Sequence, residues 1–202
     1  GKRLALVENV SSANANIYLV DLTAAAPTPT LITPHEGNIA YSVYDFTPDG
    51  QKLVYGTNEH GEFTEARTHD VATGEKAALV SADWDVLGVS FSPSGRYRVS
   101  TVNADGLWEV TFLDTATGKP VALTGVPDGE VTQVCFNADE TRVAFGVNTD
   151  TSPRNIYAAD LTTGAATRLT SALSPEIDEA NLVTASIVRY PSFDGLEIPS
   201  IF

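Results

Sequence analysis

The 202-residue sequence predicts an all-β fold, an incomplete β-propeller made of four-stranded antiparallel blades. Three observations lead to this prediction: a repeated strand–turn–strand pattern, a second turn motif after each copy, and a regular spacing between the copies. The spacing is typical of a four-stranded propeller blade, whereas leucine-rich, ankyrin and tetratricopeptide repeats are shorter and mostly need helical periodicity. We expect three full blades and one partial blade.

The first repeated pattern is an apolar alternation interrupted by a tight turn. Its three copies span residues 43–55, 89–99 and 134–145. The turns Pro48-Asp49-Gly50 and Pro93-Ser94-Gly95 combine the fixed φ of proline with the positive φ that glycine adopts easily, which predicts hairpins. The third copy carries Glu140 where the other two have glycine.

The second motif is Asp-x-x-Thr-Gly, and it follows each hairpin. It occurs at Asp70–Gly74, Asp114–Gly118 and Asp160–Gly164, with Asp21–Ala25 as a degenerate copy. Successive aspartates are therefore 49, 44 and 46 residues apart. An aspartate side chain can cap a turn while glycine takes the left-handed conformation, so we expect these motifs to join the third and fourth strands of each blade.

The position of the repeats predicts where each blade begins. Residues 1–6 align with residues 50–55, so the chain starts on the turn that follows a first strand. The expected propeller covers residues 1–172, with blades at about 1–35, 39–82, 86–125 and 130–170. Because ring closure normally removes open sheet edges, we expect a truncated propeller that needs a complementary chain or forms a homo-oligomer through those edges.

Residues after the last blade predict a connector and a final hairpin. The connector spans residues 173–186 and includes Pro175-Glu176. Residues 187–202 form two short apolar segments around Asp194-Gly195, which is a hairpin signal.

The order of these segments resembles a known junction. Propeller repeats, a Pro-Glu connector and then Ser-Phe-Asp-Gly-Leu-Glu-Ile-Pro at residues 192–199 resemble the prolyl oligopeptidase family of serine peptidases, particularly its acylaminoacyl-peptidase-like members. In that family this hairpin opens the α/β-hydrolase domain, and the blades resemble WD40-like, TolB-type repeats. The resemblance implies a propeller fragment that gates the access of short peptides to a hydrolase active site outside this chain, with the missing hydrolase domain as its partner.

Two other interpretations remain open. The chain is alternatively a free-standing TolB-like scaffold that binds other proteins. A sugar-processing propeller is a third possibility, in which carboxylates from separate blades would act as acid and base.

The sequence contains no recognisable catalytic residue. A peptidase of the family that this chain resembles needs a nucleophilic serine in a Gly-x-Ser-x-Gly turn, followed by an aspartate and a histidine. The nearest match, residues 88–92, lacks the second glycine and falls on a predicted strand. We therefore expect the chain alone to be inactive.

An acidic cluster supplies the only candidates for substrate binding. Glu59, Glu62 and Glu65 fall between the two middle strands of a blade, where carboxylates could hold the free amino end of a peptide; the alternative is a solvated loop. The three histidines, His35, His60 and His69, are interpreted as ordinary polar loop residues. No metal-ligand spacing is present, so we expect neither a metal nor a cofactor.

Composition excludes some partner classes. The chain has 12 lysines and arginines and 26 aspartates and glutamates, which give a formal charge of −14. Neither nucleic acid nor an anionic membrane is therefore an expected partner of this acidic protein. The single cysteine, Cys135, lies in an apolar alternation and is interpreted as a buried hydrophobic residue. Without a second cysteine or an apparent export signal, we expect a cytoplasmic location.

Overall fold

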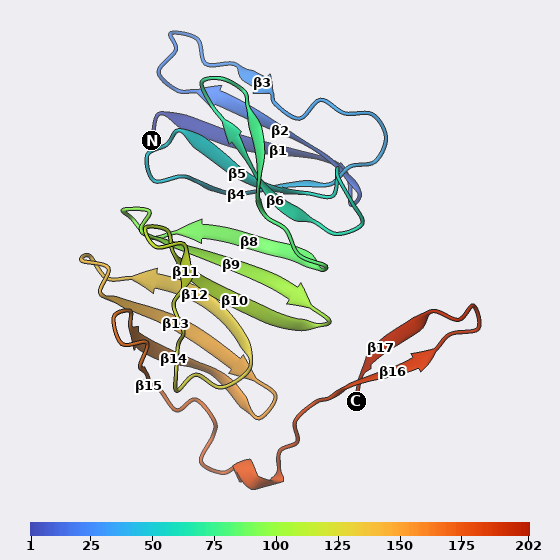
Figure 1. The fold of residues 1–202 in the computed structure, drawn as a ribbon, viewed down its shortest axis with the longest axis vertical. Coiled ribbons are helices and arrows are strands. Elements are labelled where there is room, and N and C mark those ends of the chain that lie inside the picture. Colours follow the sequence, from blue (N-terminus) through green and yellow to red (C-terminus); the bar gives the residue numbers. More distant parts are fainter. The chain divides into compact units, whose positions relative to one another are not determined.

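The computed structural model describes residues 1–202, apart from the side chain of Glu179. The chain folds as two compact units, Gly1–Asn103 with Val110–Pro120 and Ala104–Glu109 with Val121–Phe202. Figure 1 shows that the regular structure is almost entirely β-strand, arranged in separate twisted sheets. One sheet has three strands, three have four, and a two-stranded hairpin follows. This confirms the predicted fold class, three full propeller blades and one partial blade.

Blade 1 is the three-stranded sheet. Its strands are β1 (Arg3–Ser11), β2 (Asn14–Asp21) and β3 (Pro29–Leu31), in the order β1-β2-β3. β1 pairs antiparallel with β2, from Arg3 opposite Asp21 to Ser11 opposite Asn14. β1 is therefore an edge strand of this sheet.

Blade 2 is complete, and its strand order follows the sequence. It contains β4 (Tyr41–Phe46), β5 (Lys52–Thr57), β6 (Glu65–Asp70) and β7 (Lys76–Val80). The turn between β4 and β5 closes through a hydrogen bond from the Gly50 amide to the Thr47 carbonyl, and Gly50 has a φ of 68°. That positive φ explains why glycine occupies the position.

Blades 3 and 4 repeat the same four-stranded order. Blade 3 contains β8 (Asp85–Phe91), β9 (Tyr97–Ala104), β10 (Leu107–Asp114) and β11 (Lys119–Pro120). Blade 4 contains β12 (Glu130–Phe136), β13 (Arg142–Thr149), β14 (Ser152–Asp160) and β15 (Ala166–Arg168). The first turn of blade 4 forms without glycine, because Glu140 itself adopts a φ of 54°.

The Asp-x-x-Thr-Gly motifs form the turns between third and fourth strands. In blade 2 the Asp70 carboxylate accepts hydrogen bonds from the amides of Ala72 (3.0 Å) and Thr73 (2.9 Å), while Gly74 has a φ of 76°. The motifs that start at Asp114 and Asp160 form the same contacts. The repeated sequence thus produces the repeated turn.

The core of the first unit lies between adjacent blades and follows strand alternation. Leu53 and Tyr55 on β5 pack with Ile17 of blade 1, whereas Val54 between them packs with Val86 of blade 3. All of these side chains are buried. Since successive residues of a strand face opposite sides, one apolar strand supplies both interfaces.

A connector and a hairpin complete the chain. The connector contains one short 3₁₀ helix, η1 (Glu179–Asn181), and the hairpin pairs β16 (Ile187–Pro191) with β17 (Glu197–Ile201). The Gly195 amide donates to the Ser192 carbonyl, and Gly195 has a φ of 86°.

Two residue interpretations need correction. Cys135 is exposed, not buried, because β12 shifts register between Thr132 and Cys135 and this irregularity changes the face that the thiol occupies. His69 is not a loop residue: it lies on β6 and is 7% exposed. Burial and the nearby Lys76 lower its pKa.

Among the residues that the structure describes, no helix has the length and apolar character needed to cross a membrane.

Candidate functional site

The acidic cluster lies at the end of blade 2 where the β5–β6 loop leaves the sheet. Glu59 and Glu62 are in the loop, and Glu65 is the first residue of β6. His60 brings two of the three glutamates together, since its Nδ1 lies 3.9 Å from Glu59 Oε2 and 4.0 Å from Glu65 Oε1. Glu62 is exposed and takes part in none of the ion pairs among the described residues.

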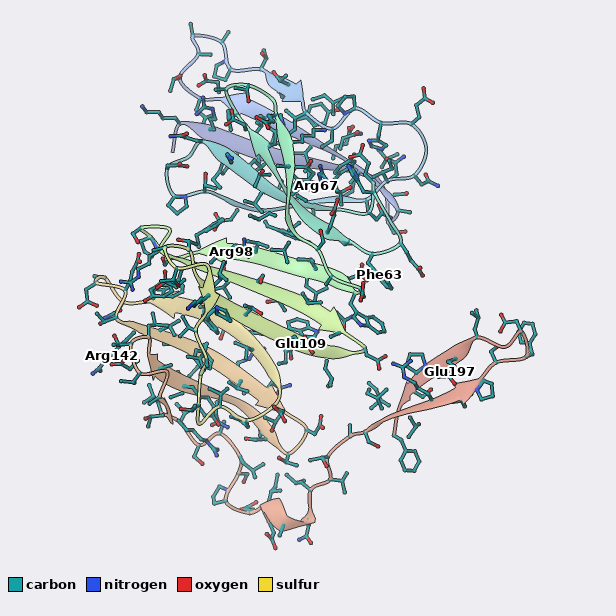
Figure 2. All side chains as sticks on the ribbon, in the orientation of Figure 1. Phe63, Arg67, Arg98, Glu109, Arg142 and Glu197 are labelled. Carbon is teal, nitrogen blue, oxygen red and sulfur yellow. The ribbon has the colours of Figure 1, made fainter. Side chains whose placement is uncertain are left out.

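Glu65 forms the strongest contact of the cluster with Arg67, which Figure 2 labels on blade 2. Arg67 Nη1 donates to Glu65 Oε1 at 2.7 Å, and both side chains are largely buried. The two residues are separated by one position on β6, so strand alternation places them on the same face. Ser81 completes the pair because its hydroxyl donates to Glu65 Oε2 at 2.9 Å.

This pairing sets the charge states of both groups. Burial acts to raise the pKa of Glu65, but the hydrogen bonds from Arg67 and Ser81 outweigh it, so the pKa is lowered. Burial also acts to lower the pKa of Arg67, and the hydrogen bond and charge of Glu65 reverse that effect and raise it. Both groups are therefore charged at neutral pH, and each neutralises the other.

Two buried tyrosines extend the cluster into the sheet. Tyr55 is fully buried, its ring centroid lies 6.1 Å from that of Tyr41, and its hydroxyl lies near Arg67 without completing a hydrogen bond. Burial raises the pKa of Tyr41, and the nearby carboxylate of Glu59 raises it further. These phenols remain neutral donors throughout the physiological pH range.

The chemistry available here is limited to binding. Glu65 is already satisfied by Arg67 and Ser81, so Glu59 is the carboxylate best able to accept a further cation or amine. Arg67 and Tyr41 escaped attention at the sequence level, although the Glu65-Ala-Arg67 spacing on a strand was a usable signal. His60 was interpreted as an ordinary polar loop residue, and its place between two glutamates was not predicted. Within the described residues, no three His, Cys, Asp or Glu side chains gather as a possible metal site.

A second feature of interest is the attachment of the terminal hairpin within the second unit. Arg189 on β16 forms an ion pair with Asp105 in the β9–β10 turn. The Ala185 amide donates to the Asp150 carboxylate, in the β13–β14 turn, at 2.8 Å. One blade turn thus holds the hairpin, and another holds the segment that leads into it.

The hairpin itself exposes an apolar surface. Its large exposed apolar side chains are Val188, Tyr190, Phe193, Leu196, Ile201 and Phe202. Phe193 and Phe202 are the most exposed of these, at 102% and 88%. Such a concentration of exposed apolar side chains on one small element is typical of a surface that another part of a protein covers.

Comparisons with sequences are negative. No model of a protein family matches the chain, and no curated protein matches it.

Comparisons with solved structures find propellers. Prolyl oligopeptidase B from Galerina marginata, bound to a 35mer substrate, matches with a TM-score of 0.79 and 18% identity over 98% of this chain and 29% of its own. A puromycin hydrolase matches with a TM-score of 0.79 and 17% identity over 100% of this chain and 32% of its own. TolB from Acinetobacter baumannii matches with a TM-score of 0.62 and 23% identity over 96% of this chain and 45% of its own.

These likenesses cover almost the whole of this chain but less than half of each solved protein. Identities this low show the fold alone. The chain is therefore a propeller segment whose structural neighbours include members of the prolyl oligopeptidase family and TolB.

Proposed function

We propose that this chain is the non-catalytic propeller segment of a prolyl-oligopeptidase-like serine peptidase, of the acylaminoacyl-peptidase-like kind. In this role it gates the access of peptides to a hydrolase active site outside residues 1–202. The partner is then the hydrolase domain, the parent substrates are short peptides, and the single cysteine fits a cytoplasmic location.

The hairpin β16–β17 is the observation that carries this proposal. It is the first strand pair after the last blade, contains the Ser192–Pro199 segment on which the family resemblance rests, and exposes large apolar side chains. A free-standing scaffold has no need for such a surface, because exposing it costs solubility. A hydrolase domain packed over the hairpin would remove that cost.

The structural neighbours support the same proposal. The TM-scores to prolyl oligopeptidases, 0.73 to 0.79, exceed the 0.62 obtained with TolB. One neighbour comes from a study of two prolyl endopeptidases that concerns inter-domain dynamics in catalysis and specificity. A propeller that opens and closes over an active site would give a physical basis for such dynamics.

Glu59 is the first residue to test for contact with the amino end of a substrate. Glu65 and Glu62 are weaker candidates on structural grounds. Glu65 is already paired with Arg67, and Glu62 takes no part in the contacts at His60. In the gating proposal, these glutamates act only by binding, and no catalytic step involves them.

The alternative is a TolB-like scaffold that binds other proteins. The likeness to TolB over 96% of this chain favours it. The two functions differ in what the coding region downstream of Phe202 contains, since only the peptidase requires a Gly-x-Ser-x-Gly turn followed by aspartate and histidine.

The test combines the sequence of that downstream coding region with an enzyme assay. We expect the 202-residue chain to hydrolyse acylated chromogenic peptides no faster than buffer, and the full-length product to cleave them with a kcat/KM that falls as peptide length increases. Hydrolysis by the chain alone would contradict the non-catalytic role. A downstream region without the serine turn, or a kcat/KM independent of peptide length, would exclude the gating peptidase.

A further inference from the structure

Three polar atoms of blade 2 are buried without a hydrogen-bond partner among the described residues. They are the hydroxyl oxygens of Tyr41 and Tyr55 and the Nε of Arg67. Tyr41 and Tyr55 are 4% and 0% exposed, and the side chain of Arg67 is 15% exposed. A buried polar group without a hydrogen bond costs folding free energy, and proteins usually satisfy it with another polar group or with ordered water. These three atoms therefore need a partner.

The strand register brings the three atoms together. Tyr55 on β5 lies directly opposite Arg67 on β6, and Tyr41 on β4 lies opposite Thr57, two residues further along β5. Residues that are opposite in an antiparallel pair, or two apart on one strand, share a face of the sheet. The rings of Tyr41 and Tyr55 are 6.1 Å apart between centroids, and the Tyr55 hydroxyl lies near Arg67. The unpartnered atoms thus converge on one small region.

A carboxylate completes this region. Glu59 follows β5 by two residues, and its amide donates to Thr57 Oγ1 at 3.1 Å. Burial raises the pKa of Tyr41, and the nearby Glu59 carboxylate raises it further, although no hydrogen bond joins the two groups. Glu59 is therefore an acceptor beside three donors. Polar groups that lie close together without a direct bond are typical of a gap that water bridges.

Blade 4 shows that the repeat does not require these polar groups. Counted from the shared hairpin turn and confirmed by the strand pairing, the three positions carry apolar or aromatic residues in blade 4. They are Val131 for Tyr41, Phe145 for Tyr55 and Tyr157 for Arg67. The rings of Phe145 and Tyr157 stack, with centroids 6.2 Å apart. The polar region is thus a particular feature of blade 2.

We propose that one buried water molecule binds between Tyr41, Tyr55 and Arg67. It accepts hydrogen bonds from Arg67 Nε and from the Tyr55 hydroxyl, and it donates to the Tyr41 oxygen and to Glu59. These bonds satisfy all three buried atoms, and a buried water in a protein typically makes about three hydrogen bonds. The water also links the loop that carries Glu59 to the Glu65–Arg67 pair.

The charges around the region favour water over an ion. Arg67 is positively charged, so a cation would be repelled. Glu59 and Glu65 are carboxylates, so an anion would be repelled as well. Tyr55 has no exposed surface, which keeps its hydroxyl out of reach of an organic ligand. A small neutral molecule that both accepts and donates hydrogen bonds fits all of these conditions.

Thermal unfolding tests the proposal through the sign of the effect. Tyr55→Phe removes the hydroxyl and keeps the ring, and phenylalanine is the residue that blade 4 has at this position. We expect it to lower the melting temperature of the 202-residue chain by about 3 °C, because the hydroxyl loses its bond to the water. Tyr41→Phe should act in the same direction. A higher or unchanged melting temperature in both variants would show hydroxyls without partners and would overturn the proposal.

The Tyr41→Phe/Tyr55→Phe double variant tests whether one water serves both tyrosines. It should lower the melting temperature by less than the sum of the two single variants, since the loss of either hydroxyl already weakens the binding of a shared water. Additive losses would indicate two independent sites and would contradict a single water. Tyr190→Phe is the matched control, because that side chain is 51% exposed, and it should leave the melting temperature unchanged.

A crystal structure of the same chain, at a resolution that resolves ordered water, identifies the bound species. We expect one density peak at about 2.7–3.2 Å from Tyr41 Oη, Tyr55 Oη and Arg67 Nε, and a weaker peak in the Tyr55→Phe variant. Direct hydrogen bonds among the three side chains, with no density between them, would overturn the proposal. Contact distances of about 2.4 Å, which indicate a metal ion, would also overturn it. None of these outcomes depends on whether a hydrolase domain exists.

Discussion

At the scale of single residues, Arg67 shows how a charged side chain can be stabilised inside a propeller blade. It lies beside the buried Tyr55 and is balanced by Glu65, which also accepts a hydrogen bond from Ser81. A largely buried charge without a partner is much less stable than a paired one. The pair is therefore important for the stability of blade 2, whatever its role in binding.

Arg67→Met tests this contribution. We expect it to lower the free energy of unfolding by about 2 kcal/mol, because Glu65 would stay largely buried without its partner. The Glu65→Met/Arg67→Met double variant should recover most of the loss, since it leaves no unpaired charge. Urea unfolding followed by circular dichroism measures both. A double variant as unstable as the single one would show that the loss comes from packing, not from charge.

At the scale of elements, the turns between third and fourth strands are the most regular feature of the chain. Three aspartates, Asp70, Asp114 and Asp160, cap them through hydrogen bonds to backbone amides. Hydrogen bonds from Thr73 and Thr163 are the largest cause of the lowered pKa of Asp70 and Asp160, respectively. For Asp114, burial acts to raise the pKa, and the hydrogen bonds from Arg96 and the turn amides outweigh it and lower the pKa.

These shifts predict how stability depends on pH. A carboxyl group with a lower pKa in the folded state stabilises the fold above its unfolded pKa of about 3.9, and this contribution is lost as the pH falls through the folded-state pKa. We expect the melting temperature of the native chain to exceed that of the Asp70→Asn/Asp114→Asn/Asp160→Asn variant at pH 7. The difference should shrink from about pH 4 downwards. A difference that stays constant to pH 2 would contradict the role of the ionised caps.

The glycines of these turns provide a second prediction. Gly74 and Gly164 both have positive φ, at 76° and 75°, but a Cβ on Gly74 would meet no atom within 4 Å, whereas one on Gly164 would collide with the Ala122 carbonyl. Gly74→Ala should therefore cost about 1 kcal/mol from backbone strain alone. Gly164→Ala should cost at least about 1 kcal/mol more, because the Thr124 amide also donates to the Gly164 carbonyl. Equal losses in thermal unfolding would show that the Ala122 backbone moves freely.

At the scale of the whole molecule, exposed apolar surface is concentrated on the terminal hairpin. Phe193 lies at its turn and Phe202 at its end, and both are almost completely exposed. The open edge of β1 adds a second surface that favours association. These features predict a chain that associates with itself unless another part of a protein covers them.

The Phe193→Ser/Phe202→Ser variant tests the contribution of the hairpin. Sedimentation velocity should show concentration-dependent self-association of the native chain, and the variant should shift the population towards monomer. Leu31→Ser, at another exposed apolar site, serves as the control and should leave the association unchanged. A native chain that stays monomeric at high concentration would contradict the prediction.

The candidate site could be predicted only in part. Glu59 and Glu65 were found from their sequence positions, but their meeting at His60 depends on the path of the β5–β6 loop. The exposure of Cys135 escaped prediction for a related reason: a register shift in β12 reverses the alternation from which burial was inferred. Asp45 and Ser90 occupy the corresponding position in the other blades, so comparison of the repeats would have indicated an exposed site.

The sequence by itself determined the blade architecture, because local turn chemistry and strand periodicity repeat within each copy of about 45 residues. Only the tertiary structure decided which charges pair and which face each bulged strand presents. Those features depend on strand register and on neighbouring blades, which bring together residues that are distant in the sequence.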